Sequence, residues 1–364
     1  LSLYLSENEG KTWKWKEFIE YSKDKKESYS YPCLIQTPDG YLNITYSYSA
    51  GDHQESIKHV VVDPDKIATK TWAEKLGYGA GQKVLLLHCD DAGMCPEANA
   101  AVQNYIVNQQ INAAAVMMPC PNAKEMIDWA KKYPDADLGV HLTLTSEWKT
   151  YRWGPVTNPK KVPGLIDPDG KFYHEVPEVV AHASAKEVET EIRAQIDKFI
   201  ATGRRPSHID THMGTLYGSP EYVKVFLKVA EDYHLPANII NVEVPEVASY
   251  FKQAGYPIND EVIKNVASYQ LPKLDFFTSV PTGKTYEEKR ENFFKLVKSM
   301  PNGLTEIIFH PATLSDNLKS ITGSWQQRVW EGELFADPVV LQFFKDKGII
   351  ITNWKDIMRR FDAK

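Results

Sequence analysis

The chain has 364 residues, 43% of them hydrophobic and 25% charged, which supplies enough apolar side chains for a large folded core. The formal net charge of -6 and the lack of basic runs argue against nucleic acid or an anionic membrane as a partner. No apolar run approaches the roughly 20 residues that a membrane-spanning helix needs. Because the sequence begins with Leu1 rather than Met, we expect that its true beginning is missing, together with any signal peptide.

Residues 1–75 alternate short β-type runs with turn signals such as Pro38-Asp39-Gly40, which predicts a four-stranded antiparallel meander. The segment Ser6–Trp13 resembles the Asp-box of sialidase-like β-propellers, with Asn8 where that family usually has Asp. The resemblance implies the last blade of such a propeller, and one blade cannot close a propeller. Sialidases hold the substrate carboxylate with arginines, and no arginine precedes Arg152. We therefore expect an accessory β-module without sialidase chemistry.

A second pattern starts at Lys83, after a polar connection that contains three glycines and marks the domain boundary. Short apolar runs then alternate with amphipathic segments, one of which begins with the capping box Ser184-x-x-Glu187. The runs predict strands at 83–89, 111–117, 137–144, 206–211, 237–242, 274–280, 304–310 and 348–354. The predicted fold class is therefore α/β, a distorted (β/α) barrel of seven or eight strands over residues 83–364, preceded by the all-β module. Residues 148–173 predict a long loop over the barrel mouth.

Two adjacent acids, Asp90 and Asp91, end the first barrel strand in the stretch KVLLLHCDDAGMCPE, residues 83–97. Carboxylates placed side by side at the end of a buried strand repel each other and are costly to desolvate, so a positive charge must be near them. A metal ion is the simplest candidate, with one acid as a ligand and the other left as a base. The alternative is structural, because an Asp pair after a strand is often a helix cap and its neighbour.

Histidines recur at the same topological position on other strands. His141 lies at the end of the third strand, His212 follows the fourth, and His310 ends the strand at 304–310. A single histidine of this kind is more often a packed structural group than a ligand. Strand carboxyl ends, however, converge on one face of a parallel barrel. The Asp90–Asp91 pair and these three histidines together therefore favour a site on that face. One Asp and two His form a facial metal triad with open positions for water and substrate.

Four ordered motifs resemble those of the YdjC-like deacetylases, namely HCDDAG (88–93), LGVHLTL (138–144), RPSHIDTH (205–212) and EIIFHPA (306–312). The resemblance covers about residues 83–357. It implies a barrel related to polysaccharide deacetylases, one divalent metal ion (Mg or Zn), and removal of acetyl groups from N-acetylated sugars or oligosaccharides. By motif, the residues that resemble the metal ligands are Asp91, His141 and His212, while Asp90 resembles the catalytic base and His310 the catalytic acid.

There are two departures from the family pattern, and the second concerns the substrate rather than the reaction. Ala92 replaces the usual aromatic residue of DDFG, and Met213 and Gly214 follow His212 where the family has further histidines. A backbone N–H near Gly93 is a candidate to stabilise the oxyanion. Asp210 and His208 either orient His212 or only pack their strand, and the remaining histidines, His88 among them, are interpreted as structural or solvated.

Two other functional classes stay open at this point: an O-acetyl sugar esterase, and a catalytically inactive carbohydrate-binding protein. A glycosidase fits poorly, because adjacent acids do not flank a glycosidic bond. A homodimer is the assembly considered. A periplasmic or secreted location is favoured over a cytoplasmic one, because the sialidase-like module indicates export.

Overall fold

The computed structural model describes residues 1–5, 10, 15–20, 27–50, 55–64, 70–111 and 113–363. The chain divides into two compact units, Leu1–Gln82 and Lys83–Lys364. Among the described residues, no helix combines the length and the apolar character needed to cross a membrane.

The described residues of the first unit form two small antiparallel sheets and a short helix. Its elements are β1 (Ser2–Leu5), β2 (Trp15–Phe18), β3 (Ser28–Gln36), β4 (Leu42–Ser49), β5 (Glu55–Val62) and α2 (Trp72–Lys75). Among the described residues, strand β1 pairs only with β2, and β3, β4 and β5 form a separate three-stranded meander. The prediction of one four-stranded meander was therefore wrong. The Asp-box-like segment Ser6–Trp13 lies, apart from Gly10, outside the described residues, so the propeller resemblance stays a prediction.

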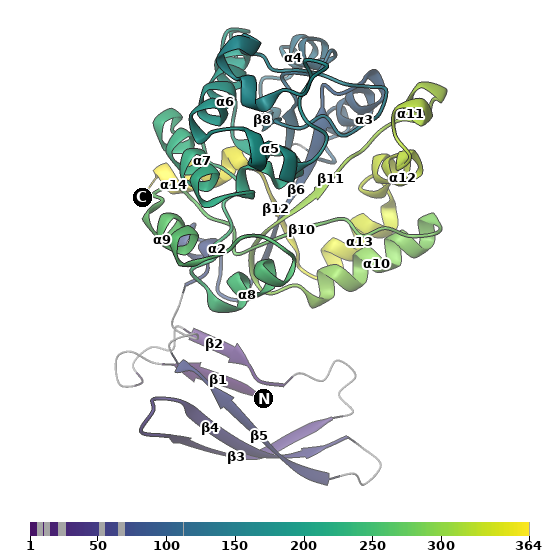
Figure 1. Cartoon of the computed structure of the whole chain (residues 1–364). Helices are drawn as coiled ribbons and strands as arrows, with labels where there is room; N and C mark the ends of the chain where they lie inside the picture. The colour runs from purple at the N-terminus through teal and green to yellow at the C-terminus, as the bar shows by residue number, and fades with distance from the viewer. Residues whose placement is uncertain are drawn as a thin grey trace. The chain divides into compact units, whose positions relative to one another are not determined.

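The second unit is built on a curled parallel sheet surrounded by helices (Figure 1). Its strands are β6 (Lys83–Ala92), β7 (Ala113–Val116), β8 (Asp137–Leu142), β9 (Ile209–Thr211), β10 (Phe276–Ser279), β11 (Gly303–Phe309) and β12 (Ile350–Thr352). The order is β10-β11-β6-β7-β8-β9, and β12 also pairs with β6. Two short strands thus share one edge of β6, with β12 beside residues 84–86 and β7 beside residues 88–92.

Isolated bridges continue this ladder from β9 to β10. Ile209 pairs with Ala237, and Ile240 pairs with Leu274. The predicted strand at 237–242 is therefore reduced to single bridges, whereas the other seven predicted strands form. The α/β class and the distorted barrel are confirmed.

The helices begin and end largely where the sequence signals them. They are α3 (Pro96–Val107), α4 (Ala123–Ala130), α5 (Val176–His182), α6 (Ala185–Ile200), α7 (Pro220–Tyr233), α8 (Pro245–Gln253), α9 (Asp260–Ser268), α10 (Tyr286–Ser299), α11 (Asp316–Ile321), α12 (Trp325–Leu334), α13 (Pro338–Asp346) and α14 (Trp354–Asp362). The capping box of Ser184 and Glu187 starts α6 as predicted. Three 3₁₀ segments complete the unit: η1 (Pro159–Lys161), η2 (Pro163–Leu165) and η3 (His212–Tyr217).

Candidate active site

A break in strand β6 brings two neighbouring acids into one cleft. Successive side chains of a regular strand point to opposite faces. Between Cys89 and Ala92, however, the register of β6 against β7 shifts, and Asp91 has a left-handed φ of 61°. This conformation is uncommon for a residue other than glycine, although Asp tolerates it better than most. Asp90 and Asp91 consequently line the same cavity.

Asp91, His141 and His212 converge as the sequence predicted. Asp91 Oδ1 lies 3.5 Å from His141 Nε2 and 3.5 Å from His212 Nδ1, and the two imidazole nitrogens are 3.2 Å apart. Two ligand atoms that each lie about 2.1 Å from one ion are about 3.0–3.4 Å apart at angles of about 90–109°. The three atoms therefore have nearly the spacing of one face of a coordination polyhedron, and this buried group could hold a metal ion.

Both candidate histidine ligands have their second nitrogen held by a carboxylate. His141 Nδ1 lies 2.7 Å from Asp210 Oδ2, and His212 Nε2 lies 3.1 Å from Glu147 Oε2. Each carboxylate fixes the N–H on that nitrogen and leaves the other nitrogen free for a cation. Of the two possibilities that the sequence left open for Asp210, the orientation of His212 was wrong. The register of β8 and β9 pairs Asp210 with His141, and Glu147, which the sequence did not single out, has this role for His212.

The Asp91 carboxylate requires a cation. Its side chain is 1% exposed, and within the described part of the chain neither oxygen accepts a well-formed hydrogen bond. Arg328 Nη2 on α12 lies 2.8 Å from Asp91 Oδ2. Burial alone would raise the pKa of Asp91, but Arg328 and His212 hold this pKa well below its usual value. The Oδ1 atom, which faces the two imidazoles, is the one left for a metal ion.

Carboxylates also determine the charge of the two histidines. Burial would lower the pKa of His212, but Glu147 and Asp91 raise it to about 10. In the same way, Asp210 and Asp90 outweigh burial and raise the pKa of His141 above its ordinary value. Without a metal ion, both rings are therefore positively charged at slightly acidic pH.

The predicted base and acid lie beside this group. Asp90 Oδ2 is 4.0 Å from His141 Nε2 and 3.9 Å from His310 Nε2. Asp90 is buried, whereas the His310 side chain is 34% exposed and can meet a substrate. Glu331 on α12 accepts a hydrogen bond of 2.6 Å from the His310 backbone N–H. The Glu331 carboxylate is also paired with Lys289 at 2.8 Å.

The cleft around these residues has a volume of about 400 Å³. Glu147, which precedes the predicted loop over the mouth, contacts His212. The loop itself contributes Trp153, whose ring centroid lies 6.5 Å from that of His212. Met213 and Gly214, with φ values of 52° and 65°, turn the chain after His212 and line the same cleft. The Gly93 N–H itself is not a free oxyanion donor, because it donates to Asn99 Oδ1 at 2.7 Å.

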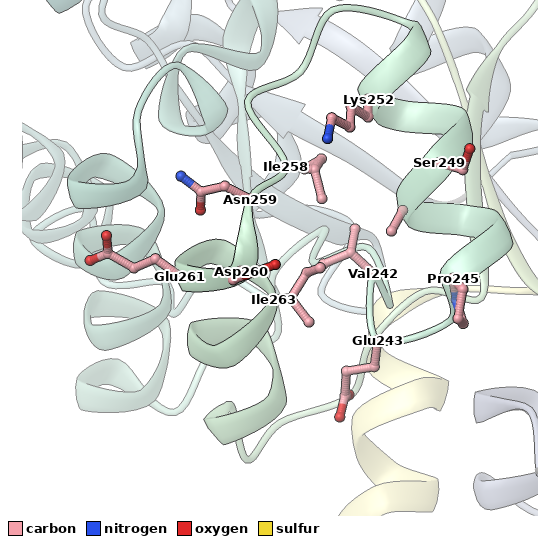
Figure 2. A pocket seen from close by; sticks show the side chains of 11 residues that line it. Val242, Glu243, Pro245, Ser249, Lys252, Ile258, Asn259, Asp260, Glu261 and Ile263 are labelled. Atoms are coloured by element: carbon pink, nitrogen blue, oxygen red, sulfur yellow. The ribbon is translucent and has the colours of Figure 1, made fainter.

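A second cavity, of about 630 Å³, lies between α8 and α9 (Figure 2). It is larger than the cleft, but its acidic side chains do not converge. Figure 2 shows that Glu243 and Glu261 point in different directions. The chemistry therefore belongs to the smaller cleft, where buried acids and histidines meet.

The structure brings together all five residues singled out from the sequence, and their catalytic and metal-binding roles stay predictions. Three further residues that contact them were missed: Glu147, Arg328 and Glu331. Glu147 lies in an irregular segment, and the other two lie on a helix that follows the last motif. No local spacing relates these residues to the ligands.

The comparisons with known proteins concern the second unit. Residues 84–346 match the family model described as YdjC-like protein. A carbohydrate deacetylase of Thermus thermophilus is 32% identical over 72% of this chain and 89% of that protein. Another, of Thermoanaerobacter pseudethanolicus, is 27% identical over 75% of this chain and 98% of that protein. The crystal structure of an Enterococcus faecalis V583 protein assigned to cellobiose-phosphate cleavage superposes with a TM-score of 0.62. It is 24% identical and covers 75% of this chain and 98% of that one, which shows a shared fold.

Replacing Glu147 with Gln tests its role at His212. We expect Glu147→Gln to bind Zn²⁺ about 10–100-fold more weakly, because the His212 N–H loses its charged acceptor. Isothermal titration calorimetry of the metal-free protein measures this loss. Glu243→Gln, at the second cavity, is the matched control and should bind as the wild type does. Equal affinities for the two variants would contradict the role of Glu147.

Metal binding should release protons. At pH 6 His212 and His141 both carry a proton that a ligand nitrogen must lose, so we expect release of two protons for each Zn²⁺ bound. The apparent affinity should rise about tenfold per pH unit for each proton released, and the His212 contribution should end near pH 10. Calorimetry in buffers of different ionisation enthalpy counts the protons. Binding without proton release would exclude these imidazoles as ligands.

Proposed function

The chain belongs to the YdjC-like protein family, and on this premise we propose that it is a metal-dependent carbohydrate deacetylase. The observation that carries the proposal is the convergence of Asp91, His141 and His212 on one point, beside Asp90 and His310. Relatives that the chain covers over most of their length are carbohydrate deacetylases. The proposed substrate is an N-acetylated sugar or oligosaccharide.

One divalent ion is proposed at the facial triad, held by Asp91 Oδ1, His141 Nε2 and His212 Nδ1. The orphaned Asp91 oxygen and the two oriented imidazoles fit such an ion. Of the two metals considered, zinc suits two imidazole ligands better than magnesium, which prefers oxygen. When bound, the ion would supply a Lewis acid that polarises the acetyl carbonyl and lowers the pKa of a water molecule.

The chain's own residues would move the protons. Asp90 Oδ2 is proposed to accept the proton of the attacking water, since it faces the cleft within 4.0 Å of His141 Nε2. His310 is proposed to protonate the leaving amine, since it lies on the exposed side of Asp90. The backbone bond to Glu331 fixes the position of His310 in the cleft. Arg328 holds the other oxygen of Asp91 and so keeps Oδ1 turned toward the histidines.

The substrate is proposed to meet the apolar side chains that line the same cleft as the acids. This apolar wall includes Met213, Tyr217, Ile240, Tyr256 and Phe277. The Tyr217 hydroxyl already donates to Asn238 O and accepts from the Ile240 N–H. Contacts with the carbon face of a sugar ring, rather than many hydrogen bonds, would therefore hold the substrate at this wall.

An O-acetyl esterase remains the second candidate, because the same groups could attack an ester carbonyl. The two activities differ in the leaving group, which is a poorly departing amine in one case and an alcohol in the other. A general acid at His310 is needed more for the amine. The exposed position of His310 beside the base therefore favours the deacetylation of an amide.

Acetate release from a panel of N- and O-acetylated sugars, with and without a chelator, tests the proposed function. We expect release from at least one N-acetylated sugar, loss of this release after chelation, and recovery on adding Zn²⁺. Release only from O-acetylated sugars would establish the esterase. Zn²⁺ binding without release from any sugar of the panel would favour an inactive carbohydrate-binding protein.

Two substitutions separate the base from the ligands. Asp90→Asn should keep Zn²⁺ affinity and lose about 10²–10⁴-fold in kcat, because an amide cannot accept the proton. His141→Ala should lose both Zn²⁺ affinity and turnover, because it removes a ligand atom. Calorimetry and acetate release on the same preparations measure the two quantities. Normal turnover of Asp90→Asn would show that the base is another group.

A further inference from the structure

A chain of buried polar side chains runs from Asp90 into the barrel interior. His88 precedes Asp90 by two residues on β6, so both point to the same side of the sheet. Its side chain is fully buried, and its Nδ1 lies 2.7 Å from Asp90 Oδ1. The opposite nitrogen, Nε2, lies 2.7 Å from His208 Nε2. From the sequence, His88 is expected to be structural or solvated, and His208 either to orient His212 or to pack its strand. The reaction proposed above uses neither.

The contacts of these groups determine where the protons lie. Burial keeps the pKa of His208 below its ordinary value, so His208 is neutral. Burial also opposes charge on His88, but Asp90 and Asp210 raise its pKa to about 10, so His88 is an imidazolium. His88 Nε2–H must then donate to His208 Nε2. The His208 proton is left on Nδ1, which faces Ser207 Oγ at 2.9 Å and Asp137 Oδ1 at 3.4 Å.

Packing fixes the His208 end of this row of buried side chains. The Trp354 ring stacks on His208 with centroids 5.6 Å apart and an angle of 24° between the planes. Gly139 leaves the space that the His208 ring occupies, because a Cβ on Gly139 would lie 2.4 Å from His208 Nε2. Asp137 accepts a hydrogen bond from the Lys355 backbone N–H at 3.1 Å. His88 is therefore attached to a rigid part of the barrel.

A metal ion does not explain this group, although His88, Asp90 and Asp210 lie within reach of one another. The 2.7 Å between His88 Nδ1 and Asp90 Oδ1 is a hydrogen-bond length and is shorter than the spacing of about 3.0–3.4 Å between two ligands of one ion. His88 thus contacts Asp90 directly through a proton.

We propose that His88 is a positioning residue for the base: it holds Asp90 Oδ1 from inside the barrel and leaves Oδ2 as the atom that accepts the proton in the cleft. The inference rests on the proposed function. Without the His88 N–H, the Asp90 carboxylate could rotate toward the cations of the cleft. Asp210, which lies 3.9 Å from His88 Nδ1, would lose a nearby positive charge. Among the described residues, the hydrogen-bond and ion-pair partners of His88 are Asp90, His208 and Asp210, none of which belongs to the apolar wall proposed to meet the substrate. The loss of His88 should therefore affect turnover and not substrate binding.

Two variants of His88 test the proposal. His88→Leu removes the N–H donor at similar volume, and His88→Asn restores a donor toward Asp90. We expect kcat of His88→Leu to fall about 10–100-fold with KM and Zn²⁺ affinity unchanged, and His88→Asn to recover most of the loss. A wild-type kcat for His88→Leu, or an equal loss for both variants, would overturn the proposal.

A double-mutant cycle separates positioning from a general structural effect. If His88 acts through Asp90, His88→Leu should cause no further loss of kcat in an Asp90→Asn background. If the two losses multiply, His88 acts independently of Asp90 and the proposal is wrong.

A measurement without turnover keeps this test separate from that of the proposed function. In the metal-free wild type, proton NMR should show a low-field imidazole N–H that is lost in His88→Asn and shifts in Asp90→Asn. This signal would support the His88–Asp90 contact even if no acetylated sugar were hydrolysed, in which case only the proposed function would fail. Absence of the signal from the wild type would overturn the positioning role.

Discussion

The cleft is organised by one buried carboxylate, Asp91, whose oxygens accept no well-formed hydrogen bond within the part of the chain that the structure describes. Removing a charge from water costs several kcal/mol unless an opposite charge or good hydrogen bonds replace the lost hydration. Asp91 is almost fully buried, and the charges that face it are Arg328 on one oxygen and two imidazoles on the other. Every nearby element is consistent with this requirement: a helix supplies the arginine, and two strand ends supply the histidines.

The backbone of β6 makes this arrangement possible at a local cost. A regular strand would bury Asp90 and direct Asp91 to the opposite face. The register shift after Cys89 and the left-handed Asp91 bring both acids into one cleft. Strained backbone of this kind persists only where the surrounding structure holds it. Here the ion pair with Arg328 and the pairing of β6 with strands on both sides hold it in place.

The sequence predicts most of the barrel, because apolar runs and caps are local signals that tertiary packing did not override. The prediction of a strand at residues 237–242 was wrong, because this apolar run forms only single bridges to its neighbours. The predicted strand pairing in the first unit was also wrong, because β1 and β2 form a sheet of their own. Pairing partners depend on contacts between distant segments, which periodicity does not contain.

The same distinction applies to the site. Asp91, His141 and His212 could be predicted because parallel strands end on one face of a barrel. Glu147 and Arg328 could not, because the sequence gives neither the path of the loop nor the face that α12 turns inward. The sequence could not show that Asp210 pairs with His141 rather than with His212, because only the register of β8 against β9 places Asp210 beside His141. The sequence alone predicts a structural or solvated His88, because it does not show that this side chain is hydrogen-bonded to Asp90 two residues later on β6.

The charges around the cleft explain how one site can be stable both with and without a cation. Four acids, Asp90, Asp91, Asp210 and Glu147, face four basic groups, His88, His141, His212 and Arg328. Burial raises the pKa of nearby Glu306 to about 8, which keeps this side chain neutral, and Lys289 balances Glu331. With the three histidines protonated, the metal-free cluster is electrically neutral. A divalent ion that displaces one proton from each of two imidazoles leaves that balance unchanged. Metal binding can therefore replace two imidazole protons with one divalent ion and leave no buried carboxylate without a cation. Arg328 and His88 keep their protons in both states, and they hold the two adjacent acids in place.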